Sequence, residues 1–148
     1  YIFYDKEDYW PSRIEEIHND DILNWLEERM FFTFLWPRPE GFNVLGDTHI
    51  NSENVKKLTD AAEGCWNALL KRDFPSFTSF VVESFEAQVR MFPRMVNDQI
   101  REIISHYKDL ARGWKLSGAG GGGYLVLFSE KHIPGAFKLK IRRRNSNL

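Results

Sequence analysis

Five glycines fill a six-residue stretch of this 148-residue chain, the run Gly118-Ala119-Gly120-Gly121-Gly122-Gly123. Each glycine loses more backbone entropy on folding than any other residue, roughly 0.5–1 kcal/mol relative to alanine in regular structure. Two arrangements compensate for this loss. Either consecutive N–H groups turn inwards around an anion, most often phosphate, or another backbone passes close over the loop. With five glycines together, we favour phosphate binding over close packing alone.

The residues on either side of the glycine run exclude several known types of phosphate-binding loop. Residues 114–116 and 124–128 both have strand composition, so the run joins two strands. The dinucleotide fingerprint, matched in letters by Gly118, Gly120 and Gly123, requires a helix after the glycines and an acidic residue about 20 positions later, and neither is present. No Gly-Lys-Ser/Thr closes a Walker loop, and no His-Arg-Asp or Asp-Phe-Gly set indicates a protein kinase.

The rest of the chain predicts a single α+β domain over residues 1–148. Hydrophobic periods of three to four residues predict helices, and short aromatic or alternating runs predict strands. The expected strands are 1–4, 13–17, 30–35, 114–116, 124–128 and 137–141. The expected helices are a short one after residues 19–21, then 52–72, 76–92 and 96–110. Residues 5–8 are expected to form an acidic turn, and residues 36–51 a surface loop.

Composition excludes several classes of function. The net charge of −1 gives no general attraction to nucleic acid or to an anionic membrane, and no apolar run approaches the ~20 residues that span a bilayer. One cysteine, Cys65, forms no internal disulfide, which favours the cytoplasm. The four histidines lack metal-ligand spacing, so no metal site is predicted. The basic run 142–144 is interpreted as part of a solvated edge strand and terminus.

The segment Lys115-Leu116-Ser117-Gly118-Ala119-Gly120-Gly121-Gly122-Gly123 resembles the third conserved motif of the GHMP small-molecule kinases. This superfamily includes galactokinase, homoserine kinase and mevalonate kinase. The order of elements from about Arg13 onwards is also similar to the C-terminal domain of that family. The resemblance implies a ferredoxin-like C-terminal domain, an antiparallel sheet with helices packed on one side. It also implies part of an ATP-dependent sugar kinase of the galactose, fucose or heptose type that uses Mg²⁺.

The resemblance also implies which residues lie at the site. We expect Ser117, Gly118, Ala119, Gly120, Gly121 and Gly122 beside the transferred phosphate. Ser84 and Gln88 are one helical turn apart, share a face, and are expected to contact the sugar substrate. Glu83-Ser84 is similar to a Glu-Ser-His step of galactokinases, although Phe85 replaces the histidine. No catalytic residue is assigned to this chain.

Five further residues are interpreted from their surroundings. Arg38, between two prolines, is interpreted as a solvated loop arginine, with contact to a substrate phosphate as the alternative. Trp36 and Trp114, like Trp25 and Trp66, are expected to anchor the core or a domain interface.

The N-terminal domain of the family carries a Pro-x-x-x-Gly-Leu-x-Ser-Ser phosphate loop, which this sequence lacks. Because the chain also starts at Tyr1 rather than Met, we expect it to be the later part of a longer protein. The isolated chain is then expected to be inactive, to hold no cofactor tightly, and to self-associate through uncovered apolar surface. The alternatives are a non-catalytic regulatory module and a stand-alone metabolite-binding domain.

Overall fold

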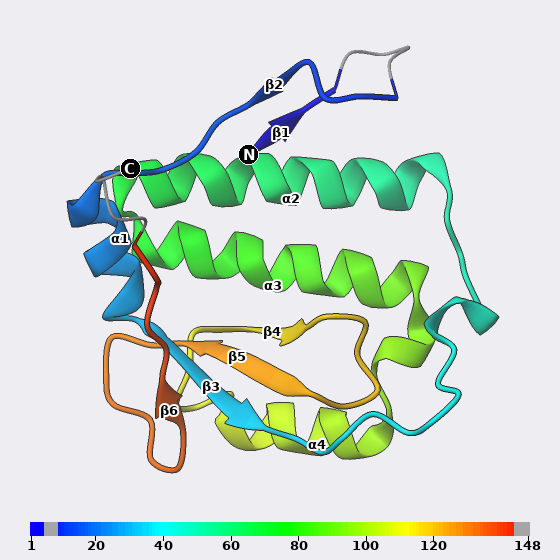
Figure 1. Ribbon diagram of the computed structural model, residues 1–148. Helices are drawn as coiled ribbons and strands as arrows, with labels where there is room; N and C mark the ends of the chain where they lie inside the picture. The colour runs from blue at the N-terminus through cyan, green and yellow to red at the C-terminus, as the bar shows by residue number, and fades with distance from the viewer. Residues whose placement is uncertain (5–8, 144–148) are drawn as a thin grey trace.

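The structure, a computed structural model, describes residues 1–4 and 9–143, and it confirms the predicted α+β class (Figure 1). The expected acidic turn at residues 5–8 and the end of the basic run at Arg144 lie outside the described residues. Within the described residues no helix is both long and apolar enough to cross a bilayer.

The main sheet contains β3 (Met30–Phe34), β4 (Gly113–Ser117), β5 (Tyr124–Phe128) and β6 (Phe137–Lys138) in the order β4-β5-β3-β6. All neighbouring strands are antiparallel, so β3 and β4 run parallel with β5 inserted between them. This is the split β-α-β arrangement of ferredoxin-like folds. The connection from β5 to β6 contains no helix and turns at Gly135, whose φ is +76°.

Three helices connect β3 to β4: α2 (Ser52–Lys71), α3 (Phe74–Met91) and α4 (Asp98–Tyr107). Each begins after a residue whose side-chain oxygen accepts a hydrogen bond from a backbone N–H of the first turn, as expected for helix N-caps. The cap residues are Asn51, Asp73 and Asn97. Together with α1 (Asp20–Glu27), these are the four predicted helices, at approximately the predicted positions.

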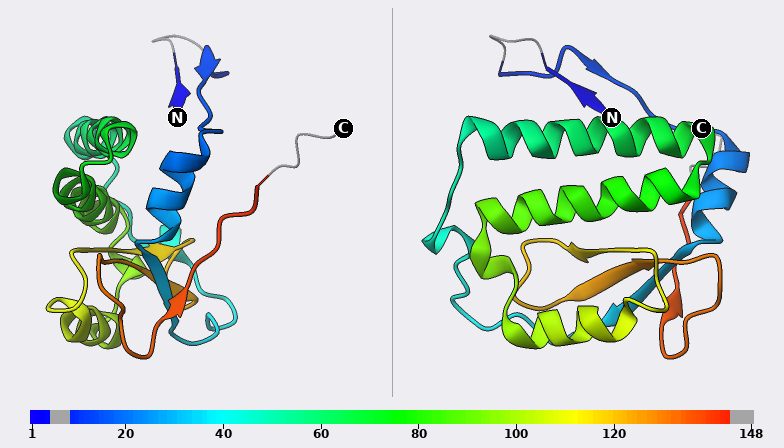
Figure 2. Two further views of the ribbon diagram at one scale, coloured as in Figure 1. Left: turned by 90° about the vertical axis from the view of Figure 1, so that its left-hand side faces the viewer. Right: turned by 180° about the vertical axis from the view of Figure 1, so that it is seen from behind.

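The helices bury one face of the sheet. Figure 1 shows α3 between α2 and the strands, and the left view of Figure 2 shows α2, α3 and α4 together on one side of the sheet. Alternate strand residues point to opposite faces, and Leu125 and Leu127 of β5 are fully buried in a cluster with Phe85 of α3 and with Ile100 and Ile104 of α4. The expectation of an antiparallel sheet with helices packed on one side is confirmed.

The N-terminal strands do not join the main sheet. β1 (Ile2–Phe3) and β2 (Arg13–Ile14) form a separate antiparallel pair, shorter than predicted, which lies over α2 in both figures. Tyr1, just before β1, contacts this helix: its ring stacks on Trp66 of α2 at 5.7 Å between centroids. Several of its side chains remain exposed, including Ile2 and Ile14.

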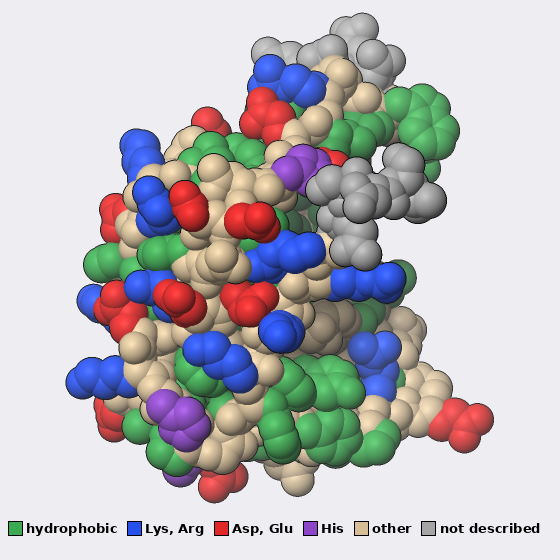
Figure 3. All heavy atoms as spheres, turned by 60° about the vertical axis from the view of Figure 1, so that its left-hand side comes forward, with side chains coloured by type: hydrophobic (Ala, Val, Ile, Leu, Met, Phe, Trp, Pro, Cys, Tyr) green, Lys and Arg blue, Asp and Glu red, His purple; other side chains and the backbone are tan. Residues whose placement is uncertain are grey.

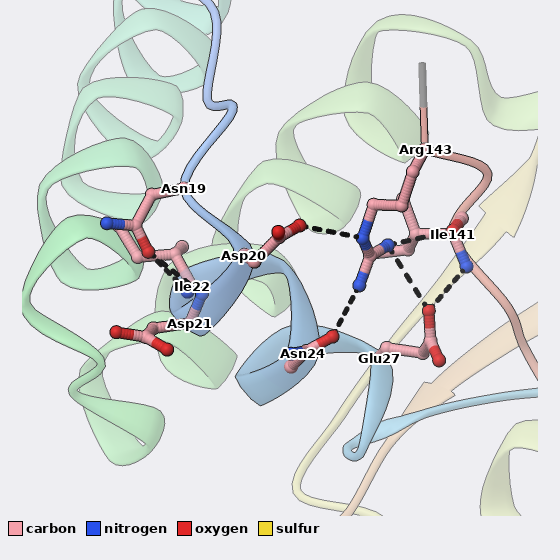
Figure 4. A network of polar contacts seen from close by, with 8 residues as sticks. All are labelled: Asn19, Asp20, Asp21, Ile22, Asn24, Glu27, Ile141 and Arg143. Carbon is pink, nitrogen blue, oxygen red and sulfur yellow. Dashed lines mark hydrogen bonds and ion pairs between the residues drawn. The ribbon is translucent and has the colours of Figure 1, made fainter. Parts of the chain in front are cut away.

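The C-terminal segment leaves the sheet early to contact α1 (Asp20–Glu27), as Figure 4 shows. The guanidinium of Arg143 lies 3.3 Å from Asp20 Oδ1, donates to Asn24 Oδ1 at 2.6 Å and approaches Glu27 Oε2 at 3.3 Å. The Ile141 N–H donates to the same Glu27 carboxylate at 2.9 Å. These contacts explain why β6 ends at residue 138 rather than 141. They also correct the interpretation of the basic run, because Arg143 is paired rather than solvated.

Candidate functional site

The glycine run forms the loop of the β4–β5 hairpin, in which Ser117 pairs with Tyr124. All five of its glycines have positive φ, from +70° at Gly121 to +150° at Gly122. Residues with a Cβ rarely adopt this region of conformational space. The backbone path of the loop therefore favours glycine at each of these five positions.

One half of the loop is buried under two other backbones. A Cβ on Gly120 would lie 2.7 Å from the Cα of Met95, and a Cβ on Gly122 would lie 2.7 Å from the carbonyl oxygen of Trp36. The N–H of Gly121 donates to the Met95 carbonyl at 2.9 Å. Close backbone packing, the less favoured interpretation of the sequence, accounts for Gly120 and Gly122, and the ring of Phe42 occupies the space beside Gly121.

The segment after β3 holds the loop from the other side. The Gly123 N–H donates to the Trp36 carbonyl at 2.8 Å, and the indole N–H of Trp36 donates to the Gly121 carbonyl at 3.1 Å. Arg38 Nε donates to the Gly120 carbonyl at 3.0 Å. Residues 36–38, predicted as the start of a surface loop, thus fix the conformation of the glycine loop.

The other half of the loop is open. Ser117 and Gly118 are exposed, Ala119 is half-buried, and the N–H groups of Gly118 and Ala119 donate to no described residue. Arg38 Nη2 lies 3.6 Å from the position that a Cβ would take on Gly118. Arg38 forms no ion pair with a described carboxylate, so its charge is available beside two free donors. Backbone N–H groups next to a guanidinium form a suitable site for an anion such as phosphate.

A pocket of about 240 Å³ adjoins the loop. It lies where η1 (Val44–Gly46), α2, α3 and η2 (Pro93–Met95) meet the loop. It is lined by Val44, Leu45, Leu58, Gln88, Phe92, Met95 and Ala119. The structure therefore brings together two residues that the sequence placed at the site, Gln88 and Ala119.

The remaining predicted site residues are distributed differently. Ser84 is half-buried on α3 but is not among the residues that line this pocket. Trp114 lies four residues before the loop and lines a different cavity, between α3 and α4. The sequence did not identify Met95 or Trp36 as loop partners. Both residues contact the loop through their backbone carbonyls, which accept hydrogen bonds from Gly121 and Gly123. Every residue has a backbone carbonyl, so the residue type does not indicate which one will accept such a bond.

The chemistry of the site comes from donors rather than from titrating groups. The described groups with a displaced pKa are Tyr1, Glu53, Cys65 and Asp73, and none of them lines the pocket. Across residues 1–4 and 9–143, no three His, Cys, Asp or Glu side chains gather to hold a metal ion. The arrangement can position an anion and offset its charge.

Comparisons with known proteins gave structural neighbours only. No protein-family model and no curated protein matches the chain. A D-glycero-D-manno-heptose 1-phosphate kinase from Bacteriodes thetaiotaomicron is similar over 78% of this chain, with a TM-score of 0.49 and 20% identity. A protein from Campylobacter jejuni described as a sugar kinase is similar over 78% of this chain, with a TM-score of 0.45 and 22% identity. This chain spans 29% and 30% of their respective lengths. Both of these structures are described as sugar kinases.

Proposed function

We propose that this chain is the C-terminal domain of an ATP-dependent sugar kinase of the GHMP type. The observation that carries the proposal is the open half of the glycine loop. There the free N–H groups of Gly118 and Ala119 lie beside the guanidinium of Arg38, next to the pocket that Ala119 shares with Gln88.

In this proposal the loop receives the phosphate during transfer. Phosphoryl transfer depends mainly on positioning and on offsetting the charge of the phosphate oxygens. Preorganised donors are effective because they need no rearrangement during the reaction. The buried contacts of Gly120 and Gly122 hold the open residues Ser117, Gly118 and Ala119 in place for this role.

The pocket takes the acceptor. The side-chain amide of Gln88 is the polar side-chain group in its lining, and it would orient a hydroxyl of the sugar towards the loop. The other lining side chains are apolar, so they would pack against the carbon skeleton of the ring. Ser84, one turn earlier on α3, would contact only an acceptor that extends along the helix.

ATP and Mg²⁺ are part of the proposal, and the residues present fit only a portion of that requirement. The loop donors and Arg38 fit one phosphate group. No cluster of metal-ligating side chains occurs in the described part of the chain. We therefore assign the metal and most contacts to ATP to a separate N-terminal domain of a cytoplasmic enzyme, which makes this chain inactive alone.

The test compares residues 1–148 with the full-length parent protein in an ATP-dependent phosphorylation assay over a panel of sugars. We expect turnover by the parent only. In the parent, Arg38→Gln should lower kcat/KM by roughly 10- to 100-fold, the usual effect of losing a hydrogen bond to a charged group. The matched control is Arg112→Gln, which removes an exposed arginine elsewhere. Efficient turnover by residues 1–148 alone would exclude the domain assignment. An unchanged Arg38→Gln enzyme would exclude the role of Arg38 at the phosphate.

One observation favours a second candidate, a non-catalytic regulatory or metabolite-binding module that packs against a partner. Phe34, Tyr124 and Phe137 are 51%, 47% and 63% exposed on the sheet face that the helices leave open. Phe137 stacks on Phe32 at 5.5 Å between ring centroids. Figure 3 shows hydrophobic side chains gathered low on the face turned to the viewer. A parent gene without an upstream Gly-Leu-Ser-Ser loop would favour this candidate over the kinase.

A further inference from the structure

A second cavity, of about 280 Å³, lies between α3 and α4 with β4 at its base. It shares no lining residue with the pocket beside the glycine loop. Its volume is just below the range of about 300–1,000 Å³ typical of ligand pockets, so it suits a small ligand. The function proposed above does not use it.

The inner wall of this cavity is apolar. Phe85 of α3 and Ile104 of α4 are 3% and 7% exposed, and the half-buried Trp114 of β4 lies with them. The indole N–H of Trp114 donates to no described residue. An aromatic wall with a free N–H accepts the apolar body of a ligand and also offers that ligand a hydrogen bond.

The rim of the cavity is cationic. Arg101, Ser105 and Lys108 are spaced by four and three residues, so they follow one face of α4 over about 10 Å. Neither cation forms an ion pair with a described carboxylate, and the Ser105 hydroxyl has no described partner. Glu86 of α3 is the acidic residue in the lining, which leaves a net charge of +1 around the opening.

The dipole of α4 accounts for the position of Lys108 but not for that of Arg101. Lys108 caps the C-terminal end of α4, where the helix dipole favours a positive charge. Arg101 is the fourth residue of the helix, near the end where the dipole disfavours a cation. No ion pair between Arg101 and the nearby Asp98 offsets this effect. A ligand that carries negative charge would account for Arg101.

We propose that this cavity, lined by Trp114, Arg101, Ser105 and Lys108, binds a small anionic ligand with an aromatic or other flat apolar body. The apolar body lies against Trp114, and the phosphate or carboxylate group lies between the two cations. The site is separate from the glycine loop, so it holds whether or not the chain is part of a kinase.

The test is a two-dimensional ¹H–¹⁵N NMR titration of residues 1–148 with phenyl phosphate and, in parallel, with phenylacetate. The indole N–H signal of Trp114, assigned with a Trp114→Phe variant, is the main readout. We expect it to shift in a saturable way together with the backbone amides of α4. Inorganic phosphate lacks the aromatic ring and benzyl alcohol lacks the negative charge. Each should therefore bind roughly 10-fold or more weakly than phenyl phosphate. Saturation with phenyl phosphate alone assigns a phosphate monoester, and saturation with both probes assigns aryl anions generally.

The matched variants separate this site from general charge attraction. Arg101→Gln combined with Lys108→Gln should weaken phenyl phosphate binding by roughly 10-fold or more. Arg112→Gln combined with Lys131→Gln removes the same charge from exposed positions outside the cavity and should leave binding unchanged. The dispersed spectrum of each variant shows whether it is folded. The proposal is overturned if neither probe saturates the Trp114 signal. Equal weakening by both pairs of substitutions would overturn it as well.

Discussion

Replacing Gly120 by alanine tests whether the buried half of the glycine loop is fixed by its neighbours. Gly120 has a φ of +77°, and the added Cβ would lie 2.7 Å from the Cα and 2.9 Å from the carbonyl carbon of Met95. These are backbone atoms, so no side-chain rotation relieves the contact. The loop or the turn at residues 93–95 must move, which weakens the 2.9 Å hydrogen bond from Gly121 to Met95.

The expected loss of stability has two parts. A left-handed conformation costs a residue with a Cβ about 1–2 kcal/mol, and forcing extra volume into a packed site costs about 1–3 kcal/mol. Gly120→Ala should therefore lower the free energy of unfolding by about 2–5 kcal/mol. Gly135→Ala is the matched control, because its φ is +76° and no atom lies within 4 Å of its added Cβ. The control should lose only the conformational part, about 1–2 kcal/mol.

Urea unfolding followed by tryptophan fluorescence measures the free energy of unfolding of both variants. The two values are comparable if the m-values of the variants are equal. In thermal unfolding, each kcal/mol should lower Tm by about 2–4 °C for a chain of this size. If Gly120→Ala loses no more stability than Gly135→Ala, the loop relaxes freely. The assignment of residues 120–122 as its fixed half would then be wrong.

Three further predictions concern other parts of the fold. Arg143→Ala should lower the free energy of unfolding by about 1–2 kcal/mol because it removes the contacts with α1, whereas the exposed Arg142→Ala should change it little. Burial raises the pKa of Cys65 to about 11, although the nearby Lys115 opposes the shift. Iodoacetamide should therefore modify the thiol slowly at pH 8 in the folded chain, and much faster in urea, where the thiol is no longer buried. Hydrogen bonds from Ser76 lower the pKa of Asp73 in the folded state. The Asp73 carboxylate therefore stabilises the fold above pH 3.8, and this contribution is lost as the pH falls through the lowered folded pKa. Between pH 5 and pH 2 the free energy of unfolding should accordingly fall less in Asp73→Asn than in the unsubstituted chain.

The sequence predicted the local structure well because helix signals are local. Cap residues such as Asn51 and Asn97 and the hydrophobic period that follows each of them are readable within one helical turn. The order of the strands is set by contacts between distant segments. For that reason the separation of β1 and β2 from the main sheet was missed, as was the early end of β6.

At the candidate site, too, the local features were predicted from the sequence and the contacts between distant segments were not. The motif located the glycine loop, and the helical spacing grouped Ser84 with Gln88, of which Gln88 lines the pocket with Ala119. The reason for Gly120 and Gly122 lies in the backbones of Met95 and Trp36, which approach from far along the chain. Arg38 carried a weak signal, a cation between two prolines. Its position beside Gly118 favours the alternative interpretation, contact with a phosphate, over that of a solvated loop arginine.

The strand order also has a consequence for synthesis on the ribosome. Among the described strands, β3 pairs with β5 and β6 alone, and both of them lie in the last quarter of the sequence. At a synthesis rate of about 5–20 residues per second, β3 waits roughly 5–20 s for its first partner strand. During that time a strand rich in phenylalanine is exposed to other nascent chains. The helices between β3 and β4 are able to form meanwhile, but the sheet closes only after the last strands have left the exit tunnel.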